Sequence, residues 1–457
     1  MQKVSADAVP ATTSSYTLAP SALYAWSIVL ILMLLYTSSF IDRQILGLLV
    51  KQVRADLHLT DTEYSYLTGF AFVFLYSVAG VPLGWAVDRW SRRGLIVLGV
   101  SLWSLMTAGC SLAGSFWRLF AFRIGVGIGE ATLSPASYAL ISDYFPTHKL
   151  SRALSVYGLG IPIGTGLALV IGGAAVQMME QLGPIDLPIL GLRKPWQLVF
   201  LAIGLPGLLL AALAALAIRE PPRSHDAIAS TRTPGIQETA RFVWARRTVY
   251  LPLFVGMGLL SVFSYGANAW YPAFLQRVHG FTIASAGLYL GVTTLIFGIL
   301  GSTAAGVLAD RLVSQGHRDG QLLVPMIYGL GLAVAGLGAG LASPTWLSLA
   351  FIAVGSFFSN TMLGCVVAAL QVATPRDMRG QVSAFFLFTA AFIGMAIGPT
   401  AVAASTDHIF GHDDAVGHAL ALVALIFPVS GAVVVSLGRR PIRQHLAGGG
   451  TTASCEG

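Results

Sequence analysis

Charged residues are scarce in this sequence. Lysine and arginine total 27 and aspartate and glutamate total 20 among 457 residues, so only 10% of the chain is charged. A soluble globular domain carries about 25% charged residues. A chain that is also 55% hydrophobic has too few polar side chains to cover a surface in water. This composition excludes a soluble globular protein and favours an integral membrane protein.

Cysteine and catalytic motifs are also lacking. The three cysteines, Cys110, Cys365 and Cys455, form neither a disulfide framework nor a metal-ligand spacing. The chain has no Gly-x-x-x-x-Gly-Lys-Ser/Thr loop for ATP, no His-Glu-x-x-His and no Gly-x-Ser-x-Gly. We therefore expect no enzyme, no cofactor and no metal. One polar cluster we interpret as a solvated loop rather than a metal site: Asp407, His408, His412, Asp413, Asp414 and His418.

Long apolar runs, by contrast, are abundant. A membrane-spanning helix needs about 20 mostly apolar residues. Twelve segments meet this requirement: 22–49, 64–87, 94–112, 116–142, 153–179, 196–218, 250–275, 284–308, 322–342, 346–371, 381–404 and 416–437. A transmembrane β-barrel would instead show short segments of alternating hydrophobicity. The sequence predicts an all-α polytopic membrane protein with two six-helix bundles.

A polar linker divides these segments. We expect a tail at 1–21, a bundle at 22–218, a linker at 219–248, a second bundle at 249–437 and a tail at 438–457. Most lysines and arginines fall in segments on the same side as both termini, so the positive-inside rule predicts cytoplasmic termini in a bacterial inner membrane. This placement of basic residues does not favour a nucleic-acid partner. The linker is either a solvated tether or contains a short surface helix.

A short motif recurs in both halves. Gly84-Trp-Ala-Val-Asp88-Arg89 follows the second predicted helix, and Gly306-Val-Leu-Ala-Asp310-Arg311 follows the eighth. Duplicated halves with a binding site between them are typical of alternating-access carriers. The first copy resembles the signature loop of the major facilitator superfamily. That resemblance implies a monomer with a cytoplasmic gate made of Asp88, Arg92 and Asp143, with Asp310 as the counterpart in the second half.

Three further segments resemble the spinster-like family within that superfamily. They are Phe40-Ile-Asp42-Arg43-Gln44, Arg123-Ile-Gly-Val-Gly-Ile-Gly-Glu130-Ala131 and Ser142-Asp143-Tyr-Phe145-Pro146. Characterised animal members carry sphingosine-1-phosphate or lysophospholipids. The resemblance therefore implies a carrier of a small amphipathic substrate of that class. The other expected partner is the surrounding membrane lipid.

Four ionised residues fall well inside predicted helices: Asp42, Arg43, Arg123 and Glu130. A charge at the bilayer centre costs at least about 2.5–3.5 kcal/mol. Arg123 and Glu130 share a helix face but lie too far apart along it to pair directly, so we expect Arg123 to reach Asp42. Burial favours a neutral carboxylic acid whereas an adjacent arginine favours the carboxylate, so a small rearrangement can change the stable form.

We predict that Asp42 carries a proton, that Glu130 is a second coupling carboxylate, and that Arg43 and Arg123 complete the charge network. A fixed network that only orients two helices is the alternative.

Several aromatic and amide side chains are candidates for the wall of an amphipathic cavity: Tyr36, Phe40, Tyr265, Asn268 and Asn360. Helix packing or an interfacial belt accounts for most aromatic residues equally well. The predicted function is a proton-coupled secondary carrier of a lipid-like anion. The alternative is a carrier of another small organic anion or drug-like compound. A membrane enzyme and a transporter-like sensor have no sequence feature of their own here.

Overall fold

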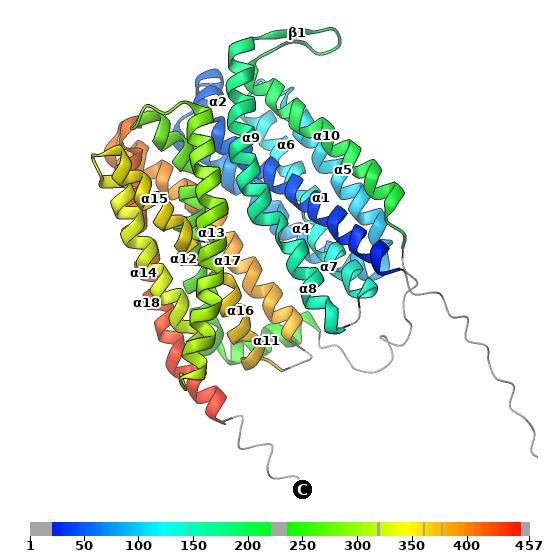
Figure 1. Cartoon of the computed structure of the whole chain (residues 1–457), viewed down its shortest axis with the longest axis vertical. Coiled ribbons are helices and arrows are strands. Elements are labelled where there is room, and N and C mark those ends of the chain that lie inside the picture. The colour runs from blue at the N-terminus through cyan, green and yellow to red at the C-terminus, as the bar shows by residue number, and fades with distance from the viewer. Residues whose placement is uncertain are drawn as a thin grey trace, which may run out of the picture.

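The computed structural model is almost entirely helical (Figure 1). It describes residues 21–145, 147–220, 235–317, 320–359, 362–375 and 378–448. The elements before the linker are α1 (Ala22–Leu48), α2 (Val50–Leu57), α3 (Asp61–Ser65), the π-helix η1 (Tyr66–Phe70), α4 (Ala71–Arg89), α5 (Arg92–Cys110), α6 (Phe116–Glu130), α7 (Leu133–Tyr144), α8 (Thr147–Gly158), α9 (Gly160–Leu182), β1 (Ile185–Leu187), β2 (Gly191–Arg193) and α10 (Pro195–Ala217). The later elements are α11 (Ile236–Ala245), α12 (Arg247–Arg277), α13 (Ile283–Ser314), α14 (Gly320–Leu341), α15 (Thr345–Ser359), α16 (Met362–Ala373), α17 (Arg379–Ala404), the π-helix η3 (Ser405–Phe410), the 3-10 helix η4 (Asp413–Ala415) and α18 (Val416–Gly448).

We call α1–α10 the first bundle and α12–α18 the second bundle. They lie side by side in Figure 1, with α1, α5 and α10 on the right and α14 and α18 on the left. At one end of the molecule β1 pairs antiparallel with β2, Ile185 opposite Arg193, and we call this the hairpin end. The opposite end carries α11 and is called the linker end. The segment after Gln237 thus forms a helix, one of the two interpretations left open by the sequence.

Nine helices in the described part of the chain are long and apolar enough to cross a membrane. The other three predicted spans are also helical, and each contains more than one described helix. In 64–87 the π-helix η1 precedes α4, 116–142 contains α6 and α7, and 346–371 contains α15 and α16. The predicted polytopic helical fold is therefore confirmed, although length alone does not identify all of its spanning segments.

The two bundles meet near the hairpin end through small residues. A Cβ added at Gly69 of η1 would run into the backbone oxygen of Met395 on α17, and one at Gly287 of α13 would run into that of Leu169 on α9. Glycine permits this close approach of helices, which is how membrane helices commonly associate. Glycine at Gly69 therefore lets η1 lie directly against the second bundle.

Toward the linker end, glycines of both bundles lack such close contacts. A Cβ added at Gly158 on α8 or at Gly306 on α13 would meet nothing within 4 Å. Figure 1 shows α8 and α13 apart at this end. The bundles thus pack closely at the hairpin end and diverge at the linker end.

The start of α5 is capped by a carboxylate that follows α10. Glu220 Oε1 accepts a hydrogen bond from the Arg92 backbone N–H at 2.9 Å, and Oε2 accepts from the Arg93 N–H at 2.9 Å and the Ser91 hydroxyl at 2.8 Å. Partial burial acts to raise the pKa of Glu220, but these bonds to the charged form outweigh it and hold the pKa below its usual value. Glu220 therefore joins the beginning of the linker to the signature loop.

Replacing this cap with Glu220→Gln should lower thermal stability in detergent at pH 7 by the equivalent of about 1 kcal/mol. Because the folded pKa lies below the unfolded value of about 4.3, the charge stabilises the protein above that pH. The contribution is lost as the pH falls through the folded pKa, so wild type and variant should converge in acid. Glu238→Gln on α11 is the matched control; equal melting of wild type and Glu220→Gln at pH 7 would contradict the assignment.

Candidate functional site

A group of buried ionisable side chains lies inside the first bundle. Asp42 and Arg43 come from α1, and Arg123 and Glu130 come from α6. Asp42 is 2% exposed, and Arg123 and Glu130 are each 1% exposed. All four residues predicted from the sequence are thus brought together, although they divide into two unequal parts.

The first part is an ion pair between Arg43 and Glu130. Arg43 Nε lies 2.6 Å from Glu130 Oε2, and the Ser39 hydroxyl donates to the same oxygen at 2.6 Å. The guanidinium also lies over the rings of Phe40 and Phe72, at 4.7 and 4.8 Å from their centroids. Burial of this cation is therefore offset by a carboxylate and by aromatic faces.

The second part pairs Arg123 with Asp42 indirectly. Arg123 Nη1 donates to the backbone oxygen of Asp42 at 3.4 Å rather than to its carboxylate. Among the described residues the Asp42 carboxylate makes no ion pair, and its Oδ1 has no hydrogen-bond partner. The Thr107 side chain on α5 lies beside it, also without a partner for its hydroxyl. The expected direct contact between Arg123 and the Asp42 carboxylate is therefore not formed, and Arg123 contacts the Asp42 backbone oxygen instead.

Aromatic side chains continue from this cluster toward the second bundle. Tyr36 stacks on Tyr157 at 4.7 Å between centroids and meets Phe40 edge-on at 5.3 Å. Tyr265, half-buried on α12, lies near Arg43. Of the other predicted lining residues, Asn268 is half-buried on α12 where that helix meets α1, and Asn360 lies outside the described residues.

The predicted cytoplasmic gate is only partly assembled. Arg92 at the start of α5 forms an ion pair with Asp143 near the end of α7, so this contact lies within the first bundle. Asp310 is exposed on α13. The side chain of Asp88 is outside the described part of the structure. Of the predicted gate residues, Arg92 and Asp143 therefore pair with each other within the first bundle.

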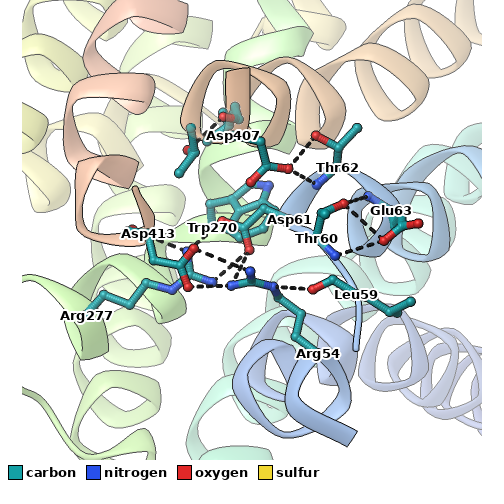
Figure 2. Close-up of polar contacts among 12 residues, drawn as sticks. Arg54, Leu59, Thr60, Asp61, Thr62, Glu63, Trp270, Arg277, Asp407 and Asp413 are labelled. Atoms are coloured by element: carbon teal, nitrogen blue, oxygen red, sulfur yellow. Dashed lines mark hydrogen bonds and ion pairs between the residues drawn. The ribbon is translucent and has the colours of Figure 1, made fainter. Parts of the chain in front are cut away.

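A polar network at the hairpin end was not predicted from the sequence. Figure 2 shows Arg54 and Asp61 of the first bundle against Arg277 and Asp413 of the second. The interpretation of 407–418 as a solvated loop is wrong for two carboxylates, because Asp413 pairs with Arg54 and Asp407 accepts two hydrogen bonds from Thr62.

Two sequence signals could have indicated this network. Arg54 and Arg277 lie on the side where the positive-inside rule disfavours arginine. The pattern Thr60-Asp61-Thr62-Glu63 is a capping box, which the structure forms.

Nine apolar helices in the described residues, with a buried charge cluster inside the first bundle, indicate a polytopic membrane protein. The family model described as Major Facilitator Superfamily matches residues 32–399. The chain belongs to the major facilitator superfamily, and within it the chain is similar to spinster proteins.

Individual similarities agree with this family. An MFS-type efflux pump of Mycolicibacterium smegmatis is 28% identical over 432 residues, 92% of this chain and 94% of the relative. The hexuronate transporter of Bacillus subtilis is 24% identical over 382 residues, 81% and 86% of the two chains. The protein spinster of Drosophila melanogaster is 27% identical over 409 residues, 85% of this chain and 63% of the relative.

Among solved structures, an inward-facing, unoccupied bacterial homologue of the human lysosomal transporter Spinster superposes with a TM-score of 0.80. It is 24% identical and covers 93% of this chain and 99% of its own. At this identity the match concerns the fold.

Removing one partner of the Arg43–Glu130 pair should destabilise the protein strongly. Glu130→Ala leaves a buried guanidinium unpaired, which costs about 3–5 kcal/mol. Ser39→Ala removes only one hydrogen bond to a charged group and should cost about 1.5–3 kcal/mol. The double variant Glu130→Ala/Arg43→Leu should recover much of the loss, as measured by thermal unfolding in detergent. A double variant no more stable than Glu130→Ala would show that the pair is not the cause.

Proposed function

We propose that this chain is a proton-coupled secondary carrier in which Asp42 holds the proton. The observation that supports this is the 2% exposed Asp42 carboxyl, which makes no ion pair among the described residues. A buried carboxylate without a partner is costly, so the neutral acid is the form that suits this arrangement. A shift of Arg123 from the backbone oxygen to the carboxylate would stabilise the charged form. Asp42 therefore has two structural states that differ by one proton and one small movement.

Glu130 is the second coupling carboxylate in this proposal. It shares Arg43 with the aromatic rings, so an anionic substrate that reaches Arg43 would compete with Glu130 for the guanidinium. Protonation of Glu130 would release Arg43 to that substrate. Proton binding and substrate binding would then be linked through one cation.

The substrate that suits this site is an amphipathic anion. Phe40 and Tyr76 are half-buried and lie around the Arg43 guanidinium, at 4.7 and 5.2 Å from the ring centroids, so they provide apolar contact beside this cation. A lipid-like molecule with an anionic headgroup, of the sphingosine-1-phosphate or lysophospholipid class, matches both features. The second candidate is a small polar carboxylate, favoured by the similarity to a hexuronate transporter.

The proposed orientation places the linker end in the cytoplasm of a bacterial cell. The distribution of lysine and arginine supports it, because arginines outnumber acidic residues in the linker and in the C-terminal tail. The bundles that move would be 22–218 and 249–437, within a monomer. In this orientation the divergent end described above opens toward the cytoplasm.

Transport in proteoliposomes tests the proposal directly. Asp42→Asn keeps the size of the side chain but cannot carry a proton, so uptake driven by an imposed pH gradient should fall at least tenfold. Exchange of labelled for unlabelled substrate without a gradient should persist, because it needs no net proton movement. Labelled lysophospholipid, sphingosine-1-phosphate and a hexuronate are the substrates, and Asp186→Asn in β1 is the matched control.

Each outcome decides a separate part of the proposal. If gradient-driven flux persists in the Asp42→Asn variant, Asp42 is not the residue that carries the proton. Flux of the hexuronate alone would replace the lipid-like substrate by the small carboxylate. Arg43→Gln, compared under the same conditions, should weaken substrate binding for either class, because both carry an anion.

A further inference from the structure

Four charged side chains meet between the bundles at the hairpin end (Figure 2). Arg54 lies on α2 and Asp61 is the first residue of α3, whereas Arg277 ends α12 and Asp413 begins η4. Each bundle thus contributes one arginine and one aspartate. We call this set the hairpin-end latch.

Asp61 is the centre of the latch. Its side chain is 0% exposed, and Arg277 binds it through two bonds, Nη1 to Oδ2 at 2.6 Å and Nη2 to Oδ1 at 2.8 Å. Arg54 Nη1 lies 2.8 Å from Asp61 Oδ1. One buried carboxylate is therefore shared by an arginine from each bundle, and the bidentate geometry belongs to the bond that crosses between them.

A second bond crosses in the opposite direction. Arg54 donates from Nη1 to Asp413 Oδ2 at 2.8 Å and from Nη2 to Oδ1 at 3.3 Å. Asp413 is also within reach of its own bundle's arginine, since Arg277 Nη1 approaches the Asp413 backbone oxygen at 3.4 Å. Of the two within-bundle pairs, Arg54–Asp61 is therefore already formed, whereas Arg277 contacts the backbone oxygen of Asp413.

Further hydrogen bonds surround the latch. Thr62 donates from its backbone N–H and hydroxyl to Asp407 Oδ2 at 2.7 and 2.6 Å, and the Ser65 hydroxyl donates to that of Thr400 at 3.2 Å. These bonds also join α3 to the second bundle. Asp407 is half-buried, so water can replace its donors when the bundles part, whereas the side chain of Asp61 is 0% exposed and needs a cationic partner.

We propose that the hairpin-end latch is a gate that opens by exchanging ion-pair partners, with Asp61 as the residue that holds it closed. Closure uses the crossing pairs Arg277–Asp61 and Arg54–Asp413. Opening leaves Arg54 on Asp61 and Arg277 on Asp413, so no charge is stranded. The gate rests on the carrier function proposed above but is independent of which residue carries the proton.

A distance measurement between the bundles tests the latch. Spin labels at Gly114→Cys and Ser343→Cys place one probe on an exposed hairpin-end loop of each bundle. Cys455 is replaced, and Cys110 and Cys365 are buried away from the label. Pulsed electron–electron double resonance in detergent or nanodiscs then reports the distance between the labels. The measurement uses neither substrate nor a pH gradient, so failure of the latch is distinguishable from failure of proton coupling.

Asp61→Asn should raise the population with the longer separation at least threefold, because two arginines then face each other with one aspartate between them. Adding Arg277→Gln should bring the population back toward wild type, since Arg54 and Asp413 can still pair. Asp413→Asn, whose carboxylate is 56% exposed, should give a smaller shift in the same direction. It serves as the second variant if Asp61→Asn does not fold.

Asp56→Asn is the matched control. Asp56 is also a carboxylate near the hairpin end, but it pairs with Lys194 and accepts from Trp196 within the first bundle. It should leave the distances unchanged. The gate is refuted if Asp61→Asn and Asp413→Asn shift the distances no more than Asp56→Asn. Partner exchange is refuted if Arg277→Gln does not restore the Asp61→Asn distribution.

Discussion

Every buried charge in a membrane-embedded helix bundle needs a partner, because neither lipid nor packed side chains can solvate it. The described structure meets this constraint at three levels. Arg43 and Glu130 pair in the middle of the first bundle, Glu220 caps α5 at the linker end, and two arginines enclose Asp61 at the hairpin end. Asp42 and Arg123 are the exceptions, because neither makes an ion pair among the described residues, and the proposal above assigns the proton to Asp42.

The three levels differ in what they connect. The middle and linker-end contacts lie within the first bundle, so they can persist while the bundles move. The hairpin-end latch joins the bundles, so it must change when they separate. In the proposed gate, each arginine of a crossing ion pair has an aspartate of its own bundle nearby. The free-energy barrier to separating the bundles is then lower, and each bundle needs both an arginine and an aspartate.

Much of the fold could be predicted from composition and segment length, because a spanning helix must be long and apolar wherever it packs. The π-helix at Tyr66–Phe70 could not, since it depends on how Gly69 meets the second bundle. Four buried charges were predictable as a group. The choice of Glu130 rather than Asp42 as the carboxylate in an ion pair was not, because it is decided by helix rotation and by Ser39. The ion pairs of loop residues such as Asp413 could not be predicted, because their partners lie far away in the sequence.

The latch and the buried charge cluster lie at the two ends of one short segment, 61–72. Asp61 begins it, Gly69 touches α17 within it, and Phe72 ends it between the two arginines, 4.8 Å from Arg43 and 5.7 Å from Arg123. Phe72 is 0% exposed, so its ring cannot move without displacing its neighbours. A π-helix lies between them, and such bulges often occur at functional sites. The latch and the buried charge cluster are therefore connected by one segment that packs directly against the second bundle at Gly69.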